Sequence, residues 1–243
     1  TKIFELSLQY GFKIIEDASH ALGALYKNVT IGQNKFSEAT VFSFHPVKMI
    51  TTGEGGAIFL KSKVSFIKAK SLRSHGIDVG KAYGTSPKKN WYYEQSDIGY
   101  NFRMSELQAA LGASQIERLE SFVEKRNILA KCYKKCLSNL PLKTQDILPG
   151  CRSSYHLFTI EIADKRFSRD DLYMFLKKNK LGCQVHYIPV HLQPLFKKRG
   201  FTRKMFPNAE NYFLNCLSIP LHPILEQPDI KFVADKLNDF FKN

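Results

Sequence analysis

One lysine of the sequence, Lys48, has surroundings that suit a catalytic role. It lies in the stretch Ser43-Phe-His-Pro-Val-Lys48-Met-Ile-Thr-Thr-Gly-Glu-Gly-Gly56. Lys48 stands between an apolar, β-rich run and a glycine-rich turn. Partial burial there would lower the pKa of the amine, as a lysine that forms a Schiff base with a carbonyl requires. The glycines would let the backbone approach a ligand or cofactor closely. The alternative is a turn lysine that precedes a glycine-rich hairpin.

A second candidate site follows the first apolar strand, in the stretch Glu16-Asp17-Ala-Ser-His20. Ligand sites in open α/β sheets lie at the carboxyl ends of strands. A carboxylate there could pair with the protonated ring nitrogen of a pyridoxal cofactor and help the ring act as an electron sink. Asp17 could instead cap a helix, and His20 could lie near the same ring or be an ordinary helix histidine. Together, Asp17 and Lys48 outline a pyridoxal phosphate site.

An α/β unit is expected to position these residues. Apolar β-rich runs predict strands at 13–17, 39–44 and 56–60, and a helical pattern at 64–72 follows the third strand. This alternation is typical of α/β architecture. Residues 76–100, rich in Gly, Tyr, Ser, Pro and Asn, predict an irregular loop region.

A single long helix is expected from Met104 to about Leu140, where Pro141 would end it. The pattern after Ser154 predicts a small α+β domain. Its expected elements are a strand at 156–162, a helix at 169–179 capped by Ser168, a short strand at 183–186, and helices at 207–217 and 228–241. We therefore expect a large domain at 1–140, which includes the long helix, and a small domain at 141–243.

The composition excludes several classes of protein. The chain has 243 residues, 44% hydrophobic and 24% charged, as in ordinary globular proteins. Its 36 Lys and Arg against 22 Asp and Glu give a net charge of +14, but the basic residues are scattered in short groups. We therefore expect a solvated surface that attracts anionic substrates, and no nucleic-acid partner. No apolar run is long enough to span a membrane, and no signal peptide is expected.

The five cysteines do not form a pattern typical of a metal site. Cys132 and Cys136 lie four residues apart in a helical pattern and lack a second pair. We expect no metal, and we expect reduced thiols in a cytoplasmic protein.

Four stretches resemble the DegT/StrS-type sugar aminotransferases: Glu16–Ala24, Phe42–Gly56, Leu72–Gly76 and Gly99–Ala110. The resemblance runs in order along essentially the whole chain. It implies a pyridoxal phosphate enzyme of fold type I, the aspartate aminotransferase-like α/β fold. The chain would then hold part of the large domain, with a mostly parallel sheet, and the small α+β domain.

The resemblance also implies a role for each matching residue. Lys48 would form the Schiff base with the cofactor and act as acid and base in the proton shift. Asp17 would pair with the ring nitrogen, His20 would lie by the ring hydroxyl, and Ser43 would bind the phosphate. Asn101 would reach the phosphate of the neighbouring subunit's cofactor, so a homodimer with shared active sites is implied.

Two further stretches, Val185–Pro194 and Phe206–Glu210, are similar to the branch of the family on the route to pseudaminic acid. That similarity implies transfer of an amino group, with L-glutamate as donor, to C4 of a UDP-linked 4-keto-6-deoxy-N-acetyl sugar. His186 and Tyr187 would contact the sugar nucleotide; the alternative is that they pack a strand end against a loop.

The family has a substantial segment ahead of the Asp17 strand, which here begins about a dozen residues into the sequence. We therefore expect a fragment of a longer protein or a truncated product. A non-catalytic remnant or partner subunit of the same fold is the alternative function.

Overall fold

The computed structural model describes residues 1–78, 91 and 93–242. These divide into two compact units, Thr1–Leu119 and Glu120–Asn243. Most of the loop region expected at 76–100 lies outside the described residues. At its two ends, β6 (Ile77–Asp78) and β7 (Glu94–Gln95) pair as antiparallel strands.

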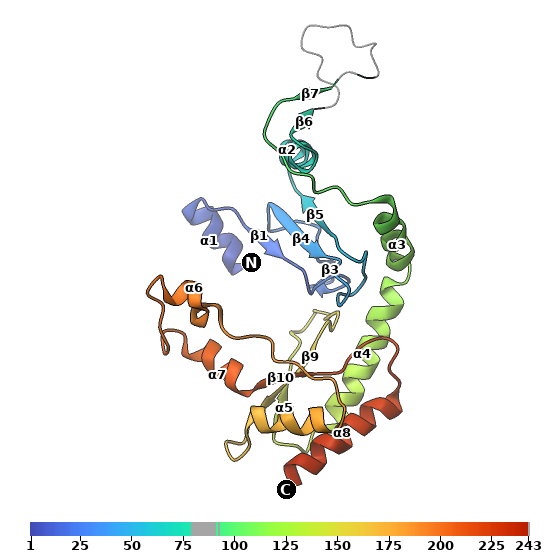
Figure 1. Cartoon of the computed structure of the whole chain (residues 1–243), viewed down its shortest axis with the longest axis vertical. Helices are drawn as coiled ribbons and strands as arrows, with labels where there is room; N and C mark the ends of the chain where they lie inside the picture. The colour runs from blue at the N-terminus through green and yellow to red at the C-terminus, as the bar shows by residue number, and fades with distance from the viewer. Residues whose placement is uncertain (79–90, 92, 243) are drawn as a thin grey trace. The chain divides into compact units, whose positions relative to one another are not determined.

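The first unit is built around a three-stranded sheet in the order β1-β4-β5 (Figure 1). Its strands are β1 (Ile15–Asp17), β4 (Ala39–Ser43) and β5 (Gly56–Leu60), so all three strands expected in this region are confirmed. β1 pairs with β4 in parallel and β4 pairs with β5 antiparallel. The sheet among the described residues is therefore mixed, with one parallel and one antiparallel pairing, where a mostly parallel sheet was expected.

Helices and a small hairpin complete the first unit. The helix α1 (Lys2–Tyr10) ends at Gly11, which has a φ of 73°. A two-stranded hairpin, β2 (Leu25–Tyr26) and β3 (Val29–Thr30), follows β1. The expected helix after β5 is confirmed as α2 (Lys63–Arg73), and the Ser62 side chain caps it by accepting the N–H of Ser65.

The prediction of one long helix is wrong: the segment forms α3 (Glu106–Ile116) and α4 (Leu119–Cys136). The Arg118 N–H donates to the Gln115 carbonyl only three residues back, so the regular helical ladder ends there. Apolar residues of α4 such as Leu129 and Tyr133 are buried in the core of the second unit. The boundary between the units therefore falls at 119/120, earlier than the expected boundary at 140.

The second unit holds an antiparallel sheet in the order β10-β9-β8. Its strands are β8 (Leu142–Thr144), β9 (Phe158–Ile162) and β10 (Cys216–Ile219), and its larger helices are α4, α5 (Arg169–Lys178), α7 (Pro207–Asn215) and α8 (Gln227–Lys242). The short helices η1 (Val190–Leu192) and α6 (Pro194–Lys197) lie between α5 and α7 in the chain. Residues of β9, α5, β10 and α8 form a continuous buried core.

Two predictions for the second unit need correction. The expected strand at 183–186 is reduced to one isolated bridge between Gln184 and Ser218. The helix expected to run to residue 217 ends at Asn215, and the chain continues directly as β10. All four residues of β10 are buried although β10 ends the strand order, so the pattern there reflects a strand covered on both faces rather than a helix face.

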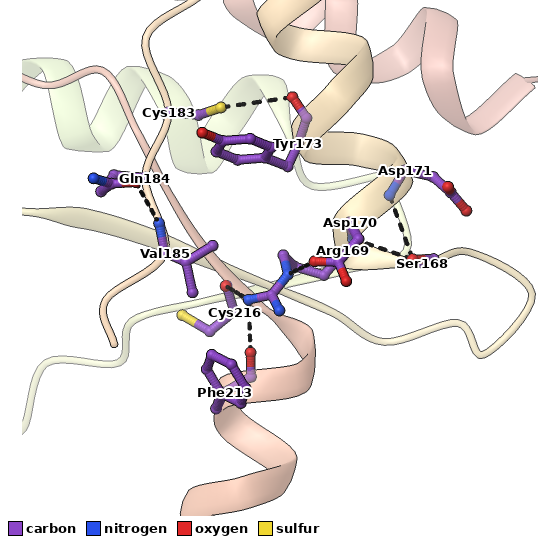
Figure 2. A network of polar contacts seen from close by, with 10 residues as sticks. All are labelled: Ser168, Arg169, Asp170, Asp171, Tyr173, Cys183, Gln184, Val185, Phe213 and Cys216. Carbon is purple, nitrogen blue, oxygen red and sulfur yellow. Dashed lines mark hydrogen bonds and ion pairs between the residues drawn. The ribbon is translucent and has the colours of Figure 1, made fainter. Parts of the chain in front are cut away.

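A polar network fixes the change from α7 to β10 (Figure 2). The Ser168 hydroxyl accepts the N–H groups of Asp170 and Asp171, which confirms the expected cap of α5. The buried Arg169 donates through Nη1 to the carbonyl of Phe213 at 2.7 Å and to that of Cys216 at 3.4 Å. The first turn of α5 is thereby tied to the residues where helix becomes strand.

Arg126 joins α4 to the two segments that flank the sheet. Its Nη1 donates to the carbonyl oxygens of Tyr155, His156 and Leu221 at 3.0, 3.3 and 2.7 Å. The side chain is 5% exposed, and burial lowers the pKa of Arg126 to about 10.

We expect Arg126→Ala to destabilise the protein by about 2–4 kcal/mol, because three buried carbonyls lose a charged donor. Removal of the cost of burying the charge offsets only part of this loss. Urea unfolding measures this difference. Lys131→Ala, at an exposed position on the same helix, is the matched control and should change stability by less than about 0.5 kcal/mol. Equal stability of the Arg126 variant and the parent would contradict this structural role.

Among the described residues, no helix has the length and apolar character needed to cross a membrane.

Candidate functional site

Asp17 is the last residue of β1 and its carboxylate is held by the next turn. Oδ1 accepts the Ser19 N–H at 3.1 Å and the Ser19 hydroxyl at 2.5 Å. These bonds lower the pKa of Asp17, and the positive charges of His20 and Lys48 lower it further. Residues 18–24 form turns rather than a helix, so the alternatives of a helix cap for Asp17 and a helix histidine at 20 are wrong. The carboxylate is therefore ionised at neutral pH.

Lys48 lies in the loop at residues 44–55 that joins β4 to β5. Its N–H donates to the His45 carbonyl at 2.9 Å, and the two residues after it, Met49 and Ile50, are 4% and 3% exposed. The Lys48 side chain is half-buried. The backbone around Lys48 is thus fixed, in contrast to a lysine on a free surface turn.

The base of this loop is closed by Phe44. Its N–H donates to the Gly55 carbonyl at 2.9 Å, and its carbonyl accepts the Thr52 N–H at 3.0 Å and the Thr51 hydroxyl at 3.1 Å. Sequence reasoning missed these threonines, although hydroxyl residues directly before a glycine are a turn signal. They hold both ends of the Lys48 loop together.

The sheet of the first unit brings three of the candidate residues together at the carboxyl ends of its strands. In the parallel pairing of β1 and β4, Asp17 lies opposite Val41, so the carboxyl ends of both strands meet there. Ser43 ends β4, its hydroxyl accepts the His45 N–H at 3.4 Å, and the Lys48 loop follows directly. The carboxylate, hydroxyl and amine therefore gather at the strand ends, where α/β sheets bind ligands.

Asn101 lies elsewhere in the first unit, ahead of α3. It forms an isolated bridge with Ser74, and its side chain is exposed and accepts a hydrogen bond from Arg103 Nε at 3.4 Å. Within the described part of the chain, no hydrogen bond or ion pair joins Asn101 to Lys48. Its reach to a second subunit's cofactor stays a prediction.

His186 and Tyr187 lie in the second unit. The Nδ1 atom of His186 is 2.8 Å from the Ser218 hydroxyl in β10, and its ring centre is 4.6 Å from that of Tyr187. Tyr187 is 67% exposed. The alternative is packing of a strand end against a loop, and the contact of His186 with Ser218 in β10 is of that kind. Contact with a sugar nucleotide stays a prediction for both residues.

The described residues contain no cluster of three or more His, Cys, Asp or Glu side chains arranged to hold a metal ion. The chemistry at the strand ends of the first unit is that of an ionised carboxylate, an amine on a fixed loop and a hydroxyl.

The sequence profile of the DegT/DnrJ/EryC1/StrS aminotransferase family matches residues 1–238. A UDP-4-amino-4,6-dideoxy-N-acetyl-beta-L-altrosamine transaminase of Campylobacter jejuni is 38% identical over 97% of this chain and 60% of its own length. The spore coat polysaccharide biosynthesis protein SpsC of Bacillus subtilis is 33% identical over 99% of this chain and 62% of its own. The chain thus spans about three fifths of the length of these curated relatives.

Solved structures agree with the sequence matches. PseC of Helicobacter pylori, an aminotransferase involved in the biosynthesis of pseudoaminic acid, has a TM-score of 0.89 and 30% identity, over 99% of this chain and 62% of its own. A putative sugar aminotransferase of Streptococcus pneumoniae in its PMP-form has a TM-score of 0.87 and 26% identity, over 97% of this chain and 61% of its own.

Proposed function

Because the chain belongs to the DegT/DnrJ/EryC1/StrS aminotransferase family, we propose that it carries the cofactor lysine of a sugar-nucleotide aminotransferase. Its fold is that of the pyridoxal phosphate-dependent family members, a mixed α/β fold of type I. The observation that carries the proposal is the gathering of Asp17, Ser43 and the Lys48 loop at the carboxyl ends of β1 and β4.

The residues present fit pyridoxal phosphate. The carboxylate of Asp17 is ionised and lies within the electrostatic reach of Lys48 and His20. An ionised carboxylate suits a protonated ring nitrogen, an amine suits an aldehyde, and the Ser43 hydroxyl suits a phosphate oxygen. When bound, the cofactor supplies a ring that withdraws electrons from the substrate carbon next to the transferred nitrogen.

Each residue then has a defined task. Lys48 would hold the cofactor through Nζ, and the same atom would accept and return the proton that the reaction moves. Asp17 keeps the proton on the ring nitrogen through its negative charge. His20 would lie by the ring hydroxyl, and the Ser43 hydroxyl would donate to the phosphate. The fixed backbone of residues 44–55 holds the base of the Lys48 side chain in place, which favours an oriented, effectively intramolecular proton transfer.

We propose that the amino group goes from L-glutamate to C4 of a UDP-linked 4-keto-6-deoxy-N-acetyl sugar. The names of the Campylobacter and Helicobacter relatives support this substrate class. His186 and Tyr187 would contact the sugar nucleotide, and the net charge of +14 would favour its anionic pyrophosphate. Asn101 would complete the cofactor site of a second subunit in a homodimer.

A single-turnover assay on the full-length protein loaded with pyridoxamine phosphate tests this function. A panel of keto sugar nucleotides should show amination of the UDP-linked 4-keto sugar in preference to 3-keto and GDP-linked sugars. Amination of a 3-keto or GDP-linked sugar instead would contradict the substrate class and leave the transaminase assignment in place. Amination of none of them by a folded, loaded protein would favour a non-catalytic partner subunit.

A further inference from the structure

The start of α3 and the residue before its cap contact the Lys48 loop at three points, and the proposed function gives these contacts no role. Gln108 and Gly112 lie four positions apart on α3. Met104 precedes the cap, and a Cβ atom added to Gly55 would lie 2.7 Å from its Cε. Gln108 Nε2 donates to the Glu54 carbonyl at 3.0 Å. A Cβ atom added to Gly112 would lie 2.8 Å from Cγ2 of Thr52, so the helix backbone runs directly against the loop.

The oxygen and the nitrogen of the Gln108 side-chain amide bind different partners. Oε1 accepts the N–H and the hydroxyl of Ser105 at 2.9 and 3.1 Å, and the Ser105 hydroxyl accepts the Gln108 N–H at 3.3 Å. This capping box closes the first turn of α3. Because Oε1 is used by the cap, Nε2 faces the Glu54 carbonyl as a donor. The Ser105 backbone N–H still donates to Oε1 when the Ser105 hydroxyl is absent, so the orientation of the Gln108 amide does not depend on that hydroxyl.

Three hydrogen bonds and the peptide bond between Phe44 and His45 connect Glu54 to Lys48. The Glu54 carbonyl also accepts the Thr52 hydroxyl at 2.8 Å, and Thr52 is 2% exposed. The Thr52 N–H donates to the Phe44 carbonyl at 3.0 Å. The next residue after Phe44, His45, accepts the Lys48 N–H at 2.9 Å. A shift of the Glu54 carbonyl would therefore pass through Thr52 to the start of the Lys48 turn.

We propose that Gln108 is a positioning residue for Lys48, acting through the Glu54 carbonyl and the Thr52 hydroxyl. The proposal rests on the proposed function of Lys48 as the lysine that bonds the cofactor. Without the Gln108 donor, the loop loses its hydrogen bond to α3 and keeps only the packing contacts, and Nζ samples positions from which it bonds the cofactor less well. Misplacement of a reacting group by about 1 Å can cost up to about a hundredfold in rate.

Three variants separate the loop contact from the helix cap. Gln108→Glu keeps a carboxylate oxygen to accept from Ser105 and removes the donor to Glu54. Gln108→Met removes both and adds no charge, so it controls for the new charge of the glutamate. Ser105→Ala is the matched control, because it weakens the cap and leaves the Gln108 contact with Glu54 in place.

The experiment measures, on the full-length protein, the dissociation constant of pyridoxal phosphate, the pH midpoint of the visible absorbance of the bound cofactor, and the unfolding temperature. Both Gln108 variants should bind the cofactor about tenfold more weakly and shift the pH midpoint. Ser105→Ala should lower the unfolding temperature, leave the dissociation constant within about twofold of the parent and leave the pH midpoint unchanged.

The outcomes are distinguishable. If both Gln108 variants keep the parent's affinity and pH midpoint, the positioning role is wrong and the proposed function stands. If Ser105→Ala moves both values as much as the Gln108 variants do, the effect belongs to the helix cap and the inference is also wrong. If the parent protein does not bond the cofactor at Lys48, the proposed function fails and the inference fails with it. Gln108→Glu carries the test alone if Gln108→Met does not fold.

Discussion

Lys48→Ala should abolish turnover of the full-length protein, with a loss of about 10⁴-fold or more, because the variant has no amine to bond the cofactor or to move the proton. The substitution removes a half-buried side chain and leaves the backbone bond from the Lys48 N–H to the His45 carbonyl in place. The unfolding temperature should therefore stay within a few degrees of the parent. Steady-state kinetics with the UDP-linked keto sugar, together with thermal unfolding, measure both effects.

Lys63→Ala is the matched control for this variant. Lys63 is exposed at the start of α2 in the same unit, and its loss should leave turnover unchanged. Turnover by Lys48→Ala near the parent rate would remove Lys48 from the reaction and return it to the role of a turn lysine.

Asp17→Asn should leave the cofactor bound and slow the proton shift by about 10²–10⁴-fold, because a neutral amide no longer holds the proton on the ring nitrogen. Stopped-flow absorbance of the half-reaction with the amino donor measures this step. An unchanged rate would mean that Asp17 serves only the turn that it forms with Ser19.

The pH dependence follows from the direction of the Asp17 shift. The pKa of Asp17 lies below its ordinary value of 3.8, so the carboxylate stays charged above that value and loses its charge only as the pH falls through the lowered pKa. The parent rate should therefore show no loss from Asp17 between about pH 5 and 9. Ser19→Ala removes the largest cause of the shift and should raise the pKa of Asp17 towards 3.8, which a titration of the carboxylate by NMR can follow.

The parts of the site that depend on local sequence could be predicted. The apolar runs that become β4 and β5 are bounded by glycine-rich or polar residues, so their positions follow from the pattern alone. Lys48 was recognisable because the residues on both sides have opposite tendencies, a strand before it and a glycine turn after it. The cap of α5 by Ser168 could also be predicted, because the residues that indicate it lie within one turn of the helix.

The parts that depend on tertiary contacts could not be predicted. No proline or glycine marks the break between α3 and α4, and the separation follows from which core α4 joins. The direction of the β4–β5 pairing is not encoded in hydrophobicity, because both orientations bury the same apolar residues. Gln108 and Glu54 are 54 residues apart, so no local spacing reveals their contact. The hydrogen bond between His186 and Ser218 is hidden for the same reason.

The central claim is that Lys48 bonds the cofactor, and reductive trapping tests it most directly. The full-length protein would be loaded with pyridoxal phosphate, reduced with borohydride, digested and mapped by mass spectrometry. We expect one stable adduct per chain, on the peptide that contains Lys48, and none there in Lys48→Ala. An adduct confined to other lysines, or no adduct on a protein that binds the cofactor, would contradict the assignment.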